Sequence, residues 1–412
     1  MTGSSTSTGS TSDGPTSTGS TSDGTSIGAV VAASQVVVCC GSGGVGKTTT
    51  AAVIALEAAR QGRRAVVVTI DPARRLADAL GLEGLTNTPA RIDASGIDAA
   101  GTEGSGAEGS GRDSLWDGEL WAMMLDTKAT FDGLVRRYSA DAAQAERILG
   151  NTFYENISGS LSGTQEYMAS EKLYELAVEG DYDLVVVDTP PTRNALDFIE
   201  APQRLAHFLD HRLYRVLVAP TRGIVKAVNV AAQTLVRSLS KVVGSDVIAD
   251  ALDFFAAFDG MEAGFKERAR RVDELLGAAS TAFVLVASPK ADTVTEAGYF
   301  ADKLHDAGID VRALVVNRMQ PTFAGPAGAG PDSSPASLRT RAEELAGTAL
   351  ADHYTALADS RVLAEGEHDH LTGLRSRVAP APVAELAVQP FEVTDLTSLS
   401  RLADLLFEGR ER

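Results

Sequence analysis

One stretch of this chain constrains its fold more than any other: a valine-rich run at 36–40 passes directly into a glycine-rich turn. That turn, Gly41–Thr48, has the spacing G-x-x-x-x-G-K-[ST], and a clean helical pattern follows it. Glycines permit a tight turn whose N–H groups point inward, and the positive end of the following helix attracts an anion. The stretch therefore predicts a P-loop, which cradles the phosphates of a nucleotide.

The residue types within the turn suggest individual roles. Lys47 is expected to reach the β- and γ-phosphates, and the Thr48 hydroxyl is expected to hold Mg²⁺. The other loop positions expected to bind the nucleotide are Gly43, Gly44, Val45, Gly46 and Thr49.

Length and composition exclude several classes of protein. With 412 residues, of which 44% are hydrophobic, the chain can bury a large core. A net charge of −18 argues against a nucleic-acid partner, which needs a basic face. No signal-like N-terminus or apolar run of membrane-spanning length is found, so a cytoplasmic location is expected.

The pattern along the chain predicts a disordered Ser/Thr/Gly-rich arm over 1–34 and a single domain over 35–412. Apolar runs alternate with helical segments in that domain, which predicts an α/β fold with a doubly wound, mostly parallel sheet. The expected strands are 36–40, 65–70, 120–126, 184–188, 281–287, 311–316 and a short one near 387–388. Helical insertions forming a second layer are expected at about 127–179 and 195–277, and flexible loops at about 91–114 and 321–336.

Polar residues follow several of these strands at their carboxyl ends, where ligands bind in such sheets. Asp188 is placed to orient Mg²⁺, or simply to cap its strand. Asp71 is placed to activate the water that attacks the γ-phosphate, or to cap the helix that begins at Pro72. Asn317 is placed to bind the base, and Gln320, where a guanine reader needs a carboxylate, favours adenine.

Together these segments resemble the ArsA-type ATPases, a group of arsenical-pump ATPases and ATPases that target tail-anchored membrane proteins, close to MinD and ParA. The resemblance rests on the P-loop, on Thr69–Ala73, on Asp188–Thr192 and on the late segment Val388–Phe391. It implies an ATP- and Mg²⁺-dependent dimer whose helical insertions form a client-binding surface. It also implies that Asp71 activates water and that Pro390 lies near the adenine.

Two departures from the family pattern concern hydrolysis and metal chemistry. The family carries a lysine that reaches across the dimer to the partner's nucleotide, where this chain has Ser42. Either a paralogous partner supplies that charge, or hydrolysis is slow, unless Arg193 supplies it within the chain. With only Cys39 and Cys40, the chain is expected to form neither an arsenite nor a zinc site.

The helical insertions are also poor in methionine, which promiscuous hydrophobic grooves often use. A phenylalanine stripe of Phe254, Phe255, Phe258 and Phe265 is expected to pack within the helical layer, and a client groove is the alternative.

The sequence thus predicts a dimeric Mg²⁺-dependent ATPase whose nucleotide state switches a helical surface for a client, such as a hydrophobic or membrane protein. The dimer is expected to pair two copies or one copy with a paralogous ATPase. The alternative is a weakly hydrolysing scaffold subunit in a hetero-oligomer. A ParA- or MinD-like positioning switch is less favoured, because the terminal helix at 396–406 holds no basic cluster.

Overall fold

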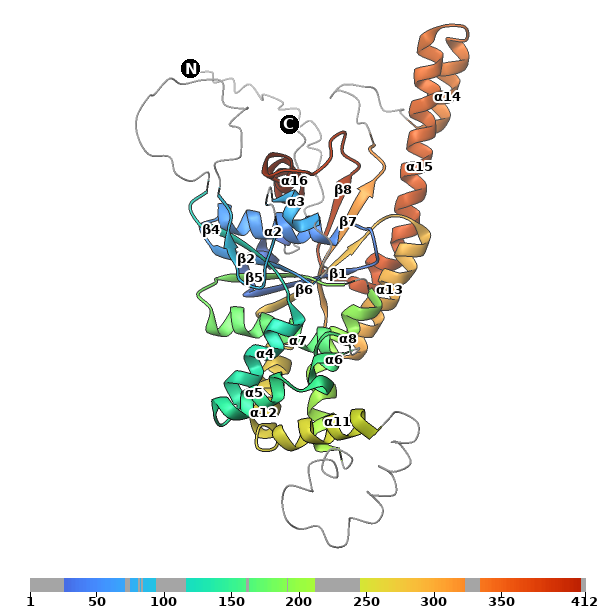
Figure 1. Cartoon of the computed structure of the whole chain (residues 1–412). Coiled ribbons are helices and arrows are strands. Elements are labelled where there is room, and N and C mark those ends of the chain that lie inside the picture. Colours follow the sequence, from blue (N-terminus) through green and yellow to red (C-terminus); the bar gives the residue numbers. More distant parts are fainter. Residues whose placement is uncertain are drawn as a thin grey trace, which may run out of the picture.

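The sheet at the centre of the molecule confirms the predicted α/β fold (Figure 1). A computed structural model describes residues 26–70, 75–80, 82, 84–93, 116–160, 163–190, 192–211, 245–322 and 334–408. Its strands are β1 (Val36–Gly41), β2 (Arg64–Thr69), β3 (Ala90–Arg91), β4 (Glu119–Met124), β5 (Leu184–Asp188), β6 (Thr281–Ala287), β7 (Val311–Met319) and β8 (Val383–Ala387). They lie in the order β3-β4-β2-β5-β1-β6-β7-β8, and every pair is parallel except β3 with β4.

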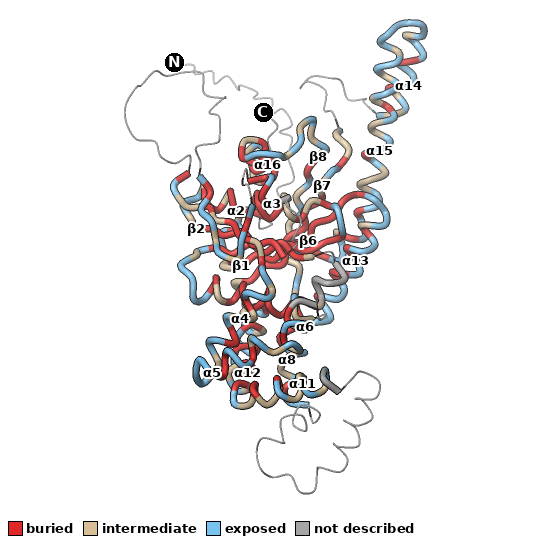
Figure 2. The backbone as a smooth tube through the Cα atoms, viewed as in Figure 1, coloured by how far each residue is buried: buried red, intermediate tan, exposed pale blue. Residues whose placement is uncertain are grey.

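Successive side chains of a strand point to opposite faces of the sheet, and the strands here are apolar on both faces. Helices therefore cover both faces. Val37 and Cys39 of β1 face one hydrophobic cluster, while Val36 and Val38 face another. The first cluster is completed by α1 (Ile27–Ala33), α2 (Lys47–Arg60), α3 (Arg75–Ala79) and α16 (Leu396–Glu408). The second is completed by α7 (Thr164–Tyr174), α8 (Thr192–Asp210), α12 (Glu262–Leu276), α13 (Ala291–Asp306) and α15 (Ala349–Val378). The central strands β1, β5 and β6 are buried from both sides, whereas the edge strands β3 and β8 are partly exposed (Figure 2).

A separate helical layer lies beyond α7 and α8 (Figure 1). It contains α4 (Thr127–Tyr138), α5 (Ala142–Leu149), α6 (Thr152–Ser160) and α11 (Ser245–Ala257), which share a third hydrophobic cluster with α7, α8 and α12. A π-helical turn, η2 (Glu175–Glu179), leads from α7 toward β5. Helices α14 (Pro335–Glu344) and α15 form a hairpin that projects past the sheet (Figure 1).

Several predicted boundaries were wrong. The arm was expected to be disordered to residue 34, but Ser26 caps α1, and Ile27, Val30 and Val31 of that helix are buried. Their i, i+3, i+4 spacing gives the helix an apolar face that packs on the sheet domain. The predicted loop at 91–114 begins with a residue of β3, and α14 begins inside the loop predicted at 321–336. Residues 94–115 and 323–333 lie outside the described part.

The strand expected over 120–126 ends at Met124, and the last expected strand lies earlier, at Val383–Ala387. The carboxylate of Asp126 instead accepts a hydrogen bond from the Ala129 N–H at 2.9 Å and so begins α4.

Candidate functional site

The P-loop lies at the carboxyl end of β1, between β5 and β6. Gly46 has φ +98°, and a Cβ there would collide with the Asn317 side-chain amide. A Cβ on Gly41 would collide with the carbonyl oxygen of Val286 on β6. Both positions therefore require glycine, for backbone conformation or for space. The loop predicted from sequence has the tight path that a phosphate cradle needs.

Lys47, near the end of the loop, is the first residue of α2, and its Nζ donates a hydrogen bond of 2.8 Å to the Ser42 carbonyl oxygen. The lysine is 8% exposed. Its ammonium group is thus held over the loop, where a phosphate bound by the loop would meet it. The Ser42 hydroxyl is itself buried, and among the described residues it has no hydrogen-bond partner.

Asp188 is the centre of a hydroxyl–carboxylate cluster beside the loop. Its Oδ2 accepts hydrogen bonds from Thr48 Oγ1 at 2.6 Å and from Thr69 Oγ1 at 3.1 Å. Strand register brings these groups together, since Asp188 lies opposite Thr69 on β2 and opposite Cys39 on β1. A buried carboxylate and a hydroxyl at this distance from one another are suitable oxygen ligands for Mg²⁺.

Thr69 is a site residue that sequence reasoning missed. Its position opposite Asp188 follows from strand order, which a single sequence does not specify. The available signal was a polar residue at the end of an otherwise apolar strand, directly before Asp71. In the structure Thr69 is buried, and its hydroxyl donates to the same Asp188 oxygen as Thr48, which helps to orient the carboxylate.

Asn317 and Pro390, the two residues expected near the base, lie toward the β7–β8 edge of the sheet. Asn317 Nδ2 donates to the carbonyl oxygen of Val45 in the P-loop at 3.0 Å. Pro390 is exposed, three residues beyond the end of β8, the neighbour of β7. The structure thus brings Asn317 to the P-loop and leaves Pro390 near the same carboxyl edge.

Two expected site groups are not described. Asp71 lies outside the described residues, although Ile70 directly before it is held by a hydrogen bond from its N–H to the Asp188 carbonyl oxygen at 3.2 Å. Arg193 lies in α8, but its side chain is not described.

The two cysteines and the phenylalanine stripe belong to the core. Burial raises the pKa of the Cys39 and Cys40 thiols above the ordinary value, which disfavours the thiolate. Phe254, Phe258 and Phe265 are at most 6% exposed, and the rings of the last two lie 4.9 Å apart. The prediction that this stripe packs the helical layer is confirmed.

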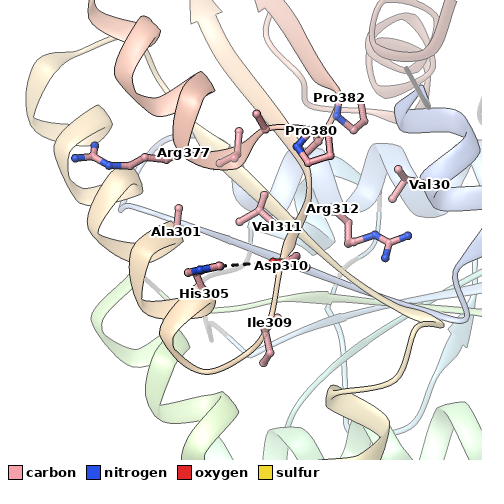
Figure 3. A pocket seen from close by; sticks show the side chains of 13 residues that line it. Val30, Ala301, His305, Ile309, Asp310, Val311, Arg312, Arg377, Pro380 and Pro382 are labelled. Carbon is pink, nitrogen blue, oxygen red and sulfur yellow. Dashed lines mark ion pairs between the residues drawn. The ribbon is translucent and has the colours of Figure 1, made fainter. Parts of the chain in front are cut away.

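A cavity of about 370 Å³ lies away from this site, at the amino ends of β7 and β8 (Figure 3). His305 and Asp310 both line it and approach each other to 3.7 Å, and both side chains are more than 80% exposed. Arg312 and Arg377 lie on opposite sides of the hollow (Figure 3). Its charged groups are exposed to solvent, and none of the residues of the P-loop or of the Asp188 cluster lines this cavity.

Comparison with known proteins connects this geometry to a family. The family model for anion-transporting ATPases of the ArsA type matches residues 34–324, more than half of the chain. The chain is 26% identical over 161 residues to ATPase asna-1 of Caenorhabditis elegans, covering 37% of this chain and 40% of that protein. It is 28% identical over 156 residues to putative arsenical pump-driving ATPase 2 of Aquifex aeolicus (strain VF5), covering 38% and 43%. The match spans less than half the length of each relative.

None of the helices in the described part of the chain combines the length and the apolar character needed to cross a membrane.

Proposed function

The chain belongs to the anion-transporting ATPase family, and on that premise we propose that it binds and hydrolyses ATP with Mg²⁺. The observation that carries this proposal is the Thr48–Asp188–Thr69 cluster beside the Lys47 ammonium group. A positive charge over a glycine cradle and oxygen ligands next to it are the two parts that phosphoryl transfer from a nucleotide requires.

We propose one role for each residue of this site. Bound Mg²⁺ would neutralise charge on the phosphates, and Thr48 and Asp188 are the residues that would hold it. Lys47 would exchange the Ser42 carbonyl oxygen for phosphate oxygens, whose negative charge makes them stronger acceptors. Asp71 would position the attacking water, and Asn317 would bind the adenine.

We further propose that the protein acts in the cytoplasm as a dimer whose nucleotide state changes the helical layer, which then binds a client. A hydrophobic or membrane protein is the favoured client. An arsenite load is disfavoured, because the two cysteines are buried in β1 and cannot supply clustered, accessible thiolates. The switch would act through the ends of β2 and β5, which precede Asp71 and the Thr189 segment.

A second function is favoured by one observation, Ser42 at the position of the family's cross-dimer lysine. A subunit that binds ATP but hydrolyses it slowly could serve as a scaffold for a paralogous ATPase. The Ser42 hydroxyl is neutral and buried, so it adds no charge toward a neighbouring subunit.

Phosphate release by the purified chain tests the main proposal. Lys47→Ala should abolish hydrolysis, whereas Asp71→Asn should reduce turnover but keep ATP binding. Lys303→Ala, which removes an exposed lysine on α13, is the matched control and should behave as wild type. Undiminished hydrolysis by the Lys47 variant would contradict the site assignment.

The scaffold alternative is tested by adding a purified paralogous P-loop ATPase and by making Ser42→Lys. If the chain is a slow hydrolase that lacks only this charge, Ser42→Lys should raise the turnover of the chain alone. If it is a scaffold, turnover should appear only with the partner, and Ser42→Lys alone should change nothing.

A further inference from the structure

Helix α15 is attached to both β7 and β8, the strands that carry or precede the residues proposed to lie near the base of the nucleotide. Asn317 is near the end of β7, and Pro390 follows β8. Strand β7 packs against α15, which shares the hydrophobic cluster on that face of the sheet through Leu371 and Leu374, and β8 is joined to α15 by ion pairs. The family match ends at residue 324, so the hairpin of α14 and α15 lies outside it.

The first attachment joins α15 to the end of β7. The backbone N–H of Gln320 donates to Glu367 Oε2 at 2.6 Å, and Gln320 Nε2 donates to Ser360 Oγ at 3.0 Å. The bond to the carboxylate is charge-assisted and short, which places it among the stronger hydrogen bonds of a protein. Two bonds from one helix therefore fix a residue that lies three positions after Asn317.

The segment between these residues is irregular. Arg318 has φ +64°, the only positive φ of a non-glycine residue in the described part, and the register with β8 shifts between Asn317 and Met319. A left-handed backbone is strained for arginine, so this conformation persists only while the surrounding structure holds it in place. The backbone N–H of Arg318 donates to Asn317 Oδ1 at 2.9 Å, so this conformation also orients the asparagine amide toward the P-loop.

The second attachment joins α15 to β8. Glu385 of β8 pairs with His368 at 3.2 Å and with Arg375, both on α15. The helix thus contacts the two strands on which the base-side residues depend. Over its 30 residues α15 is about 45 Å long, and its first part packs with α14 in the projecting hairpin (Figure 1).

We propose that α15 positions the base-binding edge of the nucleotide site and links it to the projecting hairpin, with Glu367 as the positioning residue. The inference rests on the proposed ATP binding. Releasing the Gln320 N–H would remove the support of the bulge, and Arg318 could then relax to an ordinary conformation. Asn317 would lose its orientation, whereas the P-loop and its lysine would keep theirs.

The test measures dissociation constants of the full chain for ATP and GTP by equilibrium titration with fluorescent analogues. Glu367→Ala should weaken ATP binding about tenfold, as expected when a bond to a charged group is lost. It should also reduce the preference for ATP over GTP. Glu367→Gln keeps an acceptor oxygen, so it should retain most of the ATP affinity and most of the preference for ATP over GTP. Glu365→Ala removes the same charge from an exposed position of α15 and should match wild type.

Hydrogen exchange with and without a non-hydrolysable ATP analogue tests the link to the hairpin. Amides of α14 and of the first part of α15 should change protection in wild type, and this response should be lost in Glu367→Ala. A wild-type chain that binds no nucleotide would refute the proposed function and this inference with it. Normal ATP binding and unchanged ATP/GTP preference in Glu367→Ala would overturn the inference alone, as would equal losses in Glu365→Ala.

Discussion

Different kinds of interaction determine the structure of the carboxyl edge of the sheet and that of the helical layer. At the edge, glycine conformation and hydroxyl–carboxylate bonds place a few polar groups around an open loop. In the layer, aromatic rings and an ion-pair network fill the interior, and Arg268 and Glu171 are each at most 3% exposed. The edge carries the groups proposed to bind a charged ligand, whereas the layer is held together by buried packing and ion pairs.

The network in the layer also shows how the two regions are joined. Arg268 of α12 binds Glu171 of α7 and Glu179 of the π-helical turn, and its guanidinium lies 4.1 Å from the Tyr174 ring centre. That turn leads directly toward β5, which ends at Asp188. A π-helical turn often marks a functional position. Here it connects the interior of the layer to the strand that carries the proposed metal ligand.

If the two regions have separate tasks, their variants should fail in different assays. The largest effect is expected for Arg268→Met, because removing one partner leaves the buried Glu171 charge uncompensated. We expect a loss of about 3–5 kcal/mol in the free energy of unfolding. Denaturant titration measures it. Arg270→Ala, on the exposed side of the same helix, should change stability little. Equal losses of unfolding free energy in Arg268→Met and Arg270→Ala would mean that the buried ion pairs stabilise the layer no more than exposed ones do.

The converse variant is Gly46→Ala at the edge. Its φ of +98° and the nearby Asn317 amide make alanine unfavourable there, so the loop must shift. We expect ATP affinity to fall at least about thirtyfold, with a smaller change in stability than for Arg268→Met. Gly366→Ala, an open helical position on α15, is the control. Unchanged ATP affinity in Gly46→Ala would contradict the claim that the loop needs glycine at this position to bind ATP.

A smaller effect is expected for Thr69→Val, which keeps the shape of the side chain but removes one donor to Asp188. We expect the Mg²⁺ concentration for half-maximal hydrolysis to rise about fivefold, with Lys47-dependent nucleotide binding retained. Thr50→Val is the matched control, since the Thr50 hydroxyl donates to the Gly46 carbonyl oxygen of its own helix turn. An identical Mg²⁺ dependence in Thr69→Val and wild type would remove Thr69 from the site.

The smallest effect concerns pH. Burial alone would raise the pKa of Glu179, but hydrogen bonds from Arg137 and Arg268 lower it to about 2. A lowered folded-state pKa contributes stability above the unfolded value near 4.5, and this contribution is lost as the pH falls from there toward 2. Glu179→Gln should therefore lose stability less steeply than wild type between pH 5 and 3, by less than about 1.4 kcal/mol per pH unit. Parallel stability curves would contradict the assignment.

The parts of the fold that were predictable are those specified by local sequence. The P-loop follows from glycines and a lysine at fixed spacing, and the parallel strands follow from apolar runs. The packing of the phenylalanine stripe follows from its helical period. These features depend on neighbouring residues, so one sequence contains enough information to place them.

The remaining parts depend on pairing between distant segments. Thr69 meets Asp188 only because β2 lies beside β5, and Gln320 meets Glu367 only because α15 returns along β7. The α1 helix was missed because its small residues suggested a linker, although Ser26 and the apolar spacing after it were available signals. Strand order and long-range return of helices are tertiary information, which periodicity does not contain.

We propose above all that the carboxyl edge of β1 and β5 binds Mg²⁺ and ATP through Lys47, Thr48 and Asp188. Calorimetric titration of the full chain with ATP, with and without Mg²⁺, tests it most directly. We expect saturable binding at one site per chain, strengthened by Mg²⁺ in wild type but not in Asp188→Asn, and lost in Lys47→Ala. No binding by wild type, or equal binding by wild type and Lys47→Ala, would contradict it.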